Sequence, residues 1–310
     1  MSWLSVRAAL GALALVLAAA PASDKPPARA TVALTFDDLP AHSALPPGMS
    51  RADVARGILA ALEARRVPPS YGFVNAKSLE ARPENADVLR LWRAAGHPLA
   101  NHTYSHIDLN ASSAEAFQAD VIANEKTLRD FMGEDGWRWL RFPYLRAGDT
   151  AEKRGAVAAF LKQRRYRVAE VTLNFDDWAY NEPYARCAAK QDAAGIEELK
   201  RSYETRAAAS LSDGQAAAKR VYGRDIAHVM LLHIGAFQTL MLPKLLGLLD
   251  ARGFKIVTLA EAEADPAYAE DPGLPMASGA TLLEQMIAAR KLAPVSRDGG
   301  PPARLSEICR

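Results

Sequence analysis

The chain has 310 residues, 49% of them hydrophobic, and 38 Lys and Arg nearly balance 36 Asp and Glu, for a formal net charge of +2. This balance, together with the lack of a Lys/Arg block in the sequence, gives no electrostatic reason to expect a nucleic-acid partner. Its two cysteines, Cys187 and Cys309, lie far apart and form no CxxC pair, which excludes a thiolate metal site. In an oxidising compartment they could pair with each other.

Residues 1–22 have the layout of a secretory signal peptide. One positive charge, Arg7, precedes an apolar stretch over residues 8–20, and a small-residue site follows at 20–22. Because this stretch is too short to span a bilayer easily, we expect an exported chain, periplasmic or secreted, with no transmembrane span after cleavage. An uncleaved anchor helix is the alternative. Residues 23–30 are expected to form a linker to the folded part.

From residue 31 onward, apolar runs of the β type alternate with helical patterns. Strands are expected at 31–36, 70–76, 97–103, 137–144, 166–175, 227–234 and 254–259. Helices are expected at 50–66, 84–96, from Ser112 through Phe131, and at 150–165, 239–253 and 280–291. Capping-box spacing marks the helix starts at Ser50 and Ser112. This alternation predicts a parallel α/β array, either open or closed into a barrel.

The alternation breaks between the fifth and sixth expected strands. Residues 179–226 are rich in Ala, Lys, Arg and Glu, favour two helices, and are too long for a simple crossover. We therefore expect an inserted pair of helices, which would either form a flap or act as a solvated hairpin that only stabilises the fold. Residues 266–310 are expected to contain one more helix and a mobile, Pro/Gly-rich end.

Polar side chains follow five of the expected strands. Taken singly, each has a simpler explanation, such as a turn, a helix cap, a surface ion pair or a core histidine. Because the carboxyl ends of parallel strands converge at one rim, we expect these side chains to lie close together and to form a functional site. They are, in chain order, Asp37 and Asp38, His102 and His106, Arg141 and Tyr144, Asp176, Asp177 and Trp178, and His233.

The residue types in this set suit a divalent cation. One carboxylate and two neutral imidazoles make a site for an ion such as Zn²⁺, and the spacing of His102 and His106 places both on one side of a turn. A cation would also explain the adjacent acids Asp37 and Asp38. One carboxylate could ligate it while the other takes a proton from water, and Arg141 would compensate the second negative charge.

In chain order, these segments resemble the five motifs of a known family. TFDD (35–38), HTYSH (102–106), RFPY (141–144), DW (177–178) and LLH (231–233) are similar to the motifs of NodB-homology polysaccharide deacetylases, carbohydrate esterase family 4. The resemblance covers residues 31–260. It implies a distorted (β/α)7 barrel over residues 31–265, in which 179–226 is a helical insertion between strands 5 and 6 that should overhang the site.

The resemblance also implies catalytic and metal-binding roles. Asp37 would be the general base, oriented by Arg141. His233 would be the general acid, and Asp177 would tune it. The implied cofactor is a divalent metal, Zn²⁺ first and Co²⁺ or Ni²⁺ as alternatives, and its implied ligands are Asp38, His102 and His106.

Three further residues would bind the substrate. The backbone N–H of Tyr144 would help to stabilise an oxyanion, Trp178 would form a wall of the groove, and Leu231 would line an acetyl pocket. The fourth motif departs from the family pattern, because Asn174 stands where an acid is common. Asp176 could substitute for that acid, so the division of roles between Asp176 and Asp177 stays open.

These roles predict a metal-dependent hydrolase that removes acetyl groups from an acetylated glycan, in the first place an N-acetylated polysaccharide or oligosaccharide. An O-acetyl ester, as on xylan, or a formamide would be cleaved by the same chemistry. A non-catalytic glycan-binding homologue should lack the base, a ligand or the acid, and all are present. A glycosidase is disfavoured because it needs no histidine pair and because Asp37 and Asp38 are too close in sequence to flank a sugar ring.

Overall fold

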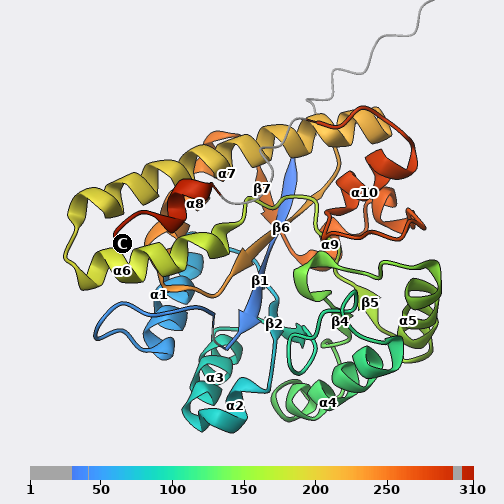
Figure 1. The fold of residues 1–310 in the computed structure, drawn as a ribbon, viewed down its shortest axis with the longest axis horizontal. Coiled ribbons are helices and arrows are strands. Elements are labelled where there is room, and N and C mark those ends of the chain that lie inside the picture. Colours follow the sequence, from blue (N-terminus) through green and yellow to red (C-terminus); the bar gives the residue numbers. More distant parts are fainter. Residues whose placement is uncertain (1–29, 41, 296–301) are drawn as a thin grey trace, which may run out of the picture.

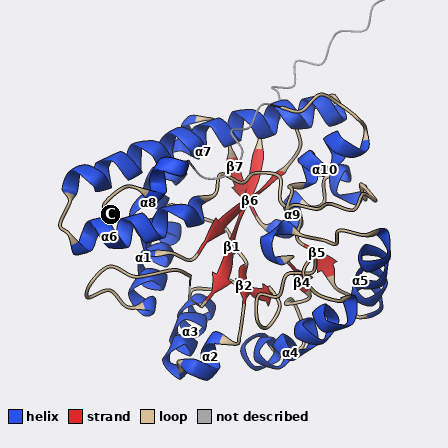
Figure 2. Cartoon of the chain, viewed as in Figure 1, coloured by secondary structure: helices blue, strands red, loops and turns tan. Residues whose placement is uncertain are grey.

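A curled sheet of parallel strands forms the centre of the molecule (Figures 1 and 2). The computed structural model describes residues 30–40, 42–295 and 302–310, so the predicted signal peptide and all but the last residue of the predicted linker lie outside the described residues. The strands are β1 (Thr31–Leu39), β2 (Gly72–Val74), β3 (Leu99–Asn101), β4 (Trp139–Leu140), β5 (Arg167–Val168), β6 (His228–His233) and β7 (Lys255–Val257). Neighbours pair in the order β5-β4-β3-β2-β1-β6, and β7 pairs with β1.

The two ends of this sheet meet at a single residue. Leu173, downstream of β5, forms an isolated parallel bridge with Met230 of β6. Its backbone N–H donates to the carbonyl oxygen of Val229, and its carbonyl oxygen accepts from the N–H of Leu231, both at 3.0 Å. The ring is thus closed by one bridge instead of a continuous strand pair. The predicted fold class, an α/β chain with a distorted seven-stranded barrel, is confirmed.

Helices cover the outside of the sheet. The capping box expected at Ser50 is present, since its side chain accepts from the N–H of Asp53 and the Asp53 carboxylate accepts in return. The helix expected from Ser112 instead has Ser113 as its N-cap. The outer helices are α1 (Arg51–Ala64), α2 (Ser78–Ala81), α3 (Ala86–Ala94), α4 (Ala114–Met132), α5 (Ala151–Gln163), α8 (Ala236–Ala251) and α9 (Leu259–Ala262).

Two expected strands are much shorter in the structure. The run 137–144 contributes only β4, and its last two residues belong to the 3-10 turn η2 (Pro143–Leu145), where Pro143 has no N–H to donate to a sheet. The run 166–175 contributes only β5, and the chain then leaves the sheet before it returns at Leu173. Apolar composition alone did not reveal either break.

Alternation along β1 decides which side chains enter the barrel. The even-numbered residues of 32–36 belong to the main core between sheet and helices, whereas Ala33 belongs to an inner cluster with Phe73. Because side chains alternate along a strand, Thr35 and Asp37 face the same way as Ala33. Asp37 therefore stands at the inner, carboxyl end of the central strand.

The predicted insertion is present as two helices, α6 (Asn181–Ala189) and α7 (Ala193–Tyr222), which follow the 3-10 turn η3 (Asp177–Tyr180). Figure 1 shows α7 running across one side of the molecule, with α10 (Leu282–Ala289) beneath its C-terminal part. Buried residues of α7 and α10 form a separate apolar cluster. No helix in the described ranges is long and apolar enough to cross a membrane.

Residues 302–310 contact the insertion, whereas most of the Pro/Gly-rich segment expected to be mobile lies outside the described residues. Cys187 of α6 forms a disulfide with Cys309, across a sequence separation of 122. The Arg186 guanidinium donates to the carbonyl oxygens of Leu305 at 3.3 Å and Ile308 at 3.0 Å. These contacts join the end of the chain to the insertion, a link that composition cannot show because its partners are remote in sequence.

We expect the double variant Cys187→Ala/Cys309→Ala to unfold at lower denaturant concentration than the wild type. A disulfide that closes so long a loop restricts the unfolded chain, and its loss typically costs about 2–4 kcal/mol. Urea unfolding followed by circular dichroism measures the midpoint, with wild-type protein under reducing agent as the control. An unchanged midpoint in both samples would contradict this role.

Candidate active site

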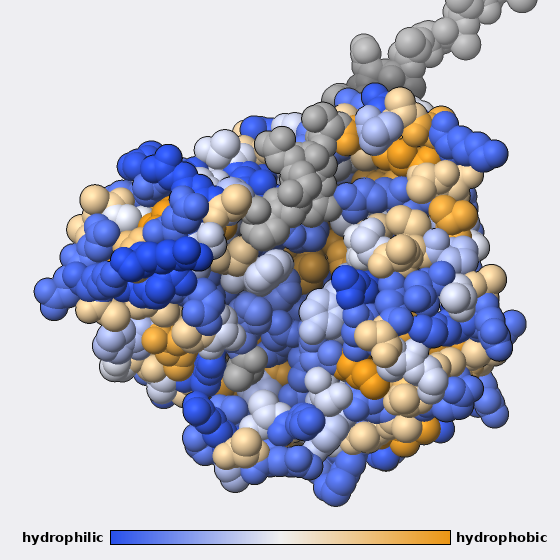
Figure 3. Space-filling model, viewed as in Figure 1, coloured by the Kyte–Doolittle hydropathy of each residue, from blue (hydrophilic) through white to orange (hydrophobic). Residues whose placement is uncertain are grey.

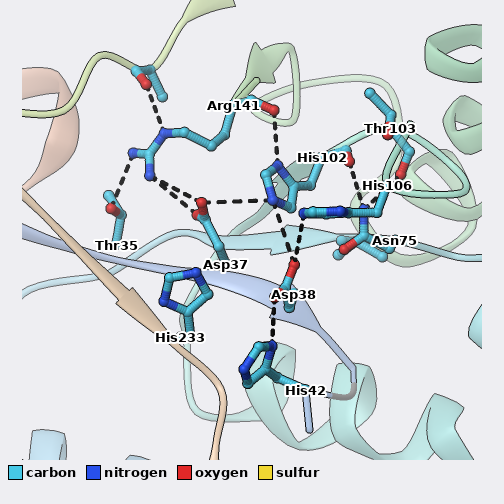
Figure 4. A network of polar contacts seen from close by, with 12 residues as sticks. Thr35, Asp37, Asp38, His42, Asn75, His102, Thr103, His106, Arg141 and His233 are labelled. Carbon is cyan, nitrogen blue, oxygen red and sulfur yellow. Dashed lines mark hydrogen bonds and ion pairs between the residues drawn. The ribbon is translucent and has the colours of Figure 1, made fainter. Parts of the chain in front are cut away.

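The polar residues predicted at the strand ends converge at the carboxyl end of the barrel (Figure 4). Asp37 and Asp38 end β1, the two histidines follow β3, Arg141 follows β4, and His233 ends β6. Asp38 has a positive φ of 67°, so the backbone turns there and the adjacent carboxylates take different neighbours.

Asp37 and Arg141 form a buried ion pair at the centre of the site. Arg141 Nη1 lies 3.1 Å from Asp37 Oδ1 and 3.3 Å from Oδ2. The rest of the guanidinium donates to Thr35 Oγ1 at 3.1 Å and to the carbonyl oxygen of Ala169 at 2.7 Å. Since both side chains are almost fully buried, each charge depends on the other for compensation.

Asp38 turns one carboxylate oxygen toward both histidines. Its Oδ1 lies 3.5 Å from His102 Nε2 and 3.4 Å from His106 Nε2. One ligand atom from each of these residues lies within 4.8 Å of the others. The structure therefore brings together the three residues predicted as metal ligands.

The orientation of this trio suits a divalent cation. His102 Nδ1 donates to the carbonyl oxygen of Arg141 at 2.8 Å, so Nε2 is the ring nitrogen that faces Asp38. Burial, together with the charge of His102, lowers the pKa of His106 to about 4. Burial acts to raise the pKa of Asp38, but hydrogen bonds from His102 and His42 outweigh it and hold the pKa well below its usual range. One carboxylate with two imidazole nitrogens is a donor set that suits Zn²⁺ and similar ions.

His233 is held by both oxygens of one carboxylate. Asp177 Oδ1 lies 2.7 Å from His233 Nδ1, and Oδ2 accepts from the backbone N–H of His233 at 2.8 Å. Burial acts to lower the pKa of His233, but the charge and hydrogen bond of Asp177 outweigh it and raise the pKa to about 9. Asp176 points elsewhere, to Arg206 at 3.1 Å. Of the two acids that the sequence left open, Asp177 is thus the one in contact with His233.

The three residues predicted to bind substrate line one large cavity, with a volume of about 1680 Å³, beside the acids and histidines. Tyr144 is 55% exposed and Trp178 41%, whereas Leu231 is buried. Residues of the insertion, including Ser210 and Gly214, line the same cavity. The hollow is visible on the face shown in Figure 3, where polar and apolar surfaces adjoin. The insertion therefore reaches the site.

The C-terminal region also shapes the cavity, which the sequence reasoning missed. A Cβ atom on Gly279 would lie 1.9 Å from the carbonyl oxygen of Tyr144, so only glycine allows this close approach. Asn110 Nδ2 donates to the carbonyl oxygen of Met276 at 2.9 Å and fixes the preceding residues. No short-range signal could have revealed contacts between such distant parts of the chain.

Two more side chains near the ligands had no predicted role. Asn75 Nδ2 donates to the carbonyl oxygens of His102 at 2.5 Å and Thr103 at 3.0 Å, so it holds the loop between the two histidines. His42 Nδ1 lies 2.7 Å from Asp38 Oδ2. His42 stands four residues after Asp38 in the sequence, and this spacing was the available signal.

Comparisons with known proteins agree with this geometry. The family model "Polysaccharide deacetylase" matches residues 24–160. A chitin deacetylase of Arthroderma benhamiae is 26% identical over 153 residues, 49% of this chain and 36% of that protein. A chitooligosaccharide deacetylase of Sinorhizobium fredii is 31% identical over 114 residues, 37% of this chain and 46% of that protein. The match thus spans less than half the length of these curated relatives.

Solved structures show the same fold. The chitin deacetylase of Colletotrichum lindemuthianum is 24% identical with a TM-score of 0.52, covering 76% of this chain and 87% of that one. A CE4 family pseudoenzyme from Bacillus anthracis is 16% identical with a TM-score of 0.51, covering 76% of this chain and 66% of that one. The family model and these relatives match the part of the chain that carries the first three motifs, in agreement with the resemblance seen in the sequence.

We expect Asp177→Asn to lower the pKa of His233 from about 9 toward the ordinary value for histidine. The substitution removes the negative charge that stabilises the imidazolium, whereas burial, which favours the neutral ring, remains. Histidine titration by NMR, with His233 assigned through a His233→Gln variant, measures the change. Asp176→Asn is the matched control and should leave the pKa near 9. A pKa that stays near 9 in Asp177→Asn would contradict the assigned cause.

Proposed function

We propose that the chain is a metal-dependent hydrolase that removes acetyl groups from an N-acetylated polysaccharide or oligosaccharide. The observation that carries this proposal is the placement of Asp37, held by Arg141, beside the trio Asp38, His102 and His106. The match to the polysaccharide deacetylase model supports the same reaction class, because relatives are named as deacetylases of chitin and chitooligosaccharides.

Asp38, His102 and His106 would hold the metal, for which we propose Zn²⁺, with Co²⁺ or Ni²⁺ as functional substitutes. When bound, the ion supplies Lewis-acid polarisation and lowers the pKa of water. Nitrogen and oxygen donors of this kind suit these ions, and three protein ligands leave positions for water and substrate.

The residues of the chain would then move the protons of amide hydrolysis. Asp37 takes a proton from the attacking water, and the Arg141 guanidinium keeps this carboxylate in place. The backbone N–H of Tyr144 donates to the acetyl oxygen as negative charge develops there. His233, protonated at neutral pH because of Asp177, gives its proton to the leaving nitrogen as the C–N bond breaks. The products are acetate and a free amine on the sugar.

Substrate binding would use the aromatic side chains at the cavity. Trp178 and Tyr144 present exposed rings against which a sugar can pack, and Leu231 offers a small apolar surface for the acetyl methyl. The insertion lines the same cavity, so we propose that it shapes the groove for the glycan.

The pseudoenzyme among the structural relatives shows that this fold alone does not make an enzyme. Here the proposed base, ligands and acid are all in place, which favours catalysis over simple glycan binding. We also propose that the chain is exported. The Cys187–Cys309 disulfide supports this location, because such bonds persist in oxidising compartments.

We expect the chain from residue 23 onward to release acetate from N-acetylglucosamine oligomers. The release should stop on treatment with a chelator and return on addition of Zn²⁺ or Co²⁺. Acetylated xylan, assayed in parallel, distinguishes an amidase from an esterase. Acetate from xylan alone would make the enzyme an esterase, and no release from either substrate by the metal-loaded protein would overturn the proposed activity.

Asp37→Asn and Asp38→Ala should separate the base from the metal ligands. We expect Asp37→Asn to lose roughly 10²–10⁴-fold in kcat while it keeps the metal, as loss of a general base requires. Asp38→Ala should lose metal and activity together. Metal content by mass spectrometry and acetate release measure both effects, with the exposed Asp87→Asn as control. Loss of metal from the Asp37 variant would require the two assignments to be exchanged.

A further inference from the structure

His42 contacts the proposed metal ligand Asp38 from the side opposite His102 and His106. Its Nδ1 lies 2.7 Å from Asp38 Oδ2, and both side chains are mostly buried, at 19% and 14% exposure. Because a carboxylate can only accept, Nδ1 carries the proton of this hydrogen bond. His42 is therefore a donor to Asp38, in contrast to the two imidazoles that face its other oxygen.

The two oxygens of Asp38 thus have different partners. Oδ1 faces His102 and His106, and Oδ2 is occupied by the N–H of His42. The hydrogen bond stops rotation of the carboxylate about its last side-chain bond. Only Oδ1 is then directed at His102 and His106. A carboxylate held in this way is prepared to give a metal one oxygen in a defined direction.

The loop that carries His42 is itself held from two sides. The Arg51 guanidinium, on α1, donates to the carbonyl oxygens of His42 and Ser43. On the other side Glu182 Oε1 accepts from Ser43 Oγ at 3.1 Å and from the backbone N–H of Ala44 at 3.3 Å. Glu182 belongs to α6, so the inserted helices are connected to a metal ligand through this loop.

We propose that His42 is a positioning residue for the metal: it fixes Asp38 as a ligand through one oxygen, and Glu182 of the insertion holds the loop that makes this contact. This inference rests on the proposed metal-dependent function. It gives the insertion a second task besides lining the cavity, namely to prepare the metal site before the ion binds.

The test is the Zn²⁺ affinity of purified protein, measured by competition with a chromophoric chelator. We expect His42→Ala to raise the Kd for Zn²⁺ by about 10–100-fold, the usual effect of removing a group that orients a ligand. His42→Asn, whose side-chain N–H can replace Nδ1–H, should recover most of the affinity. The absorption spectrum of the Co²⁺-loaded protein should shift in His42→Ala and resemble the wild type in His42→Asn.

Two substitutions in the insertion test the proposed link. Glu182→Ala should weaken Zn²⁺ binding less than His42→Ala, because it frees the loop without removing the donor. Glu197→Ala is the matched control, since Glu197 lies on α7 and pairs with Lys200, and it should bind Zn²⁺ like the wild type. Equal affinity in the Glu182 and Glu197 variants would overturn the role of the insertion.

The outcomes separate this inference from the proposed function. If the wild type retains Zn²⁺ and His42→Ala binds it equally well with an unchanged Co²⁺ spectrum, His42 does not position the ligand and the inference is wrong. Loss of acetate release at unchanged Zn²⁺ affinity would also overturn the inference. His42 would then act together with the proposed acid His233, since their ring centroids lie 5.3 Å apart. If the wild type itself bound no divalent ion, the metal-dependent function would fail first.

Discussion

The site depends on one buried interaction, the contact between Arg141 and Asp37. The guanidinium joins three strands of the barrel, since it also donates to Thr35 of β1 and to the backbone just after β5. The backbone carbonyl oxygen of Arg141 fixes the tautomer of His102. Removal of one partner would leave a buried charge without compensation, at a cost of about 3–5 kcal/mol, so the proposed base, the proposed metal site and the barrel are coupled through Arg141.

Around this centre the chain adds two supports from outside the strand–helix alternation. Asp177, just before the insertion, raises the pKa of His233, and Glu182 of the insertion holds the loop of His42. The C-terminal region packs Gly279 against Tyr144 and is joined to the insertion by the disulfide. Both segments therefore act on the orientation of side chains that the barrel presents.

Local sequence patterns predicted the parts of the fold that depend on local physics. The β-branched run ending at Asp37-Asp38 became the central strand, and the cap at Ser50 formed as expected. The predictions failed where the chain leaves regular structure. The fourth strand ended early, before Pro143, and the fifth strand returned to the sheet only at Leu173. Neither event has a hydrophobic period of its own, so a pattern of apolar residues could not show it.

The sequence by itself determined the order of strands and helices, and the five sets of polar residues at strand ends, because parallel strands must bring those ends to one rim. Only the tertiary structure decided which neighbours these residues meet. It set Asp177 rather than Asp176 on His233, turned the two oxygens of Asp38 toward different histidines, and placed Gly279 on Tyr144. These choices depend on contacts between distant segments at a precision of tenths of an ångström, which the packing of the whole molecule fixes and no local pattern encodes.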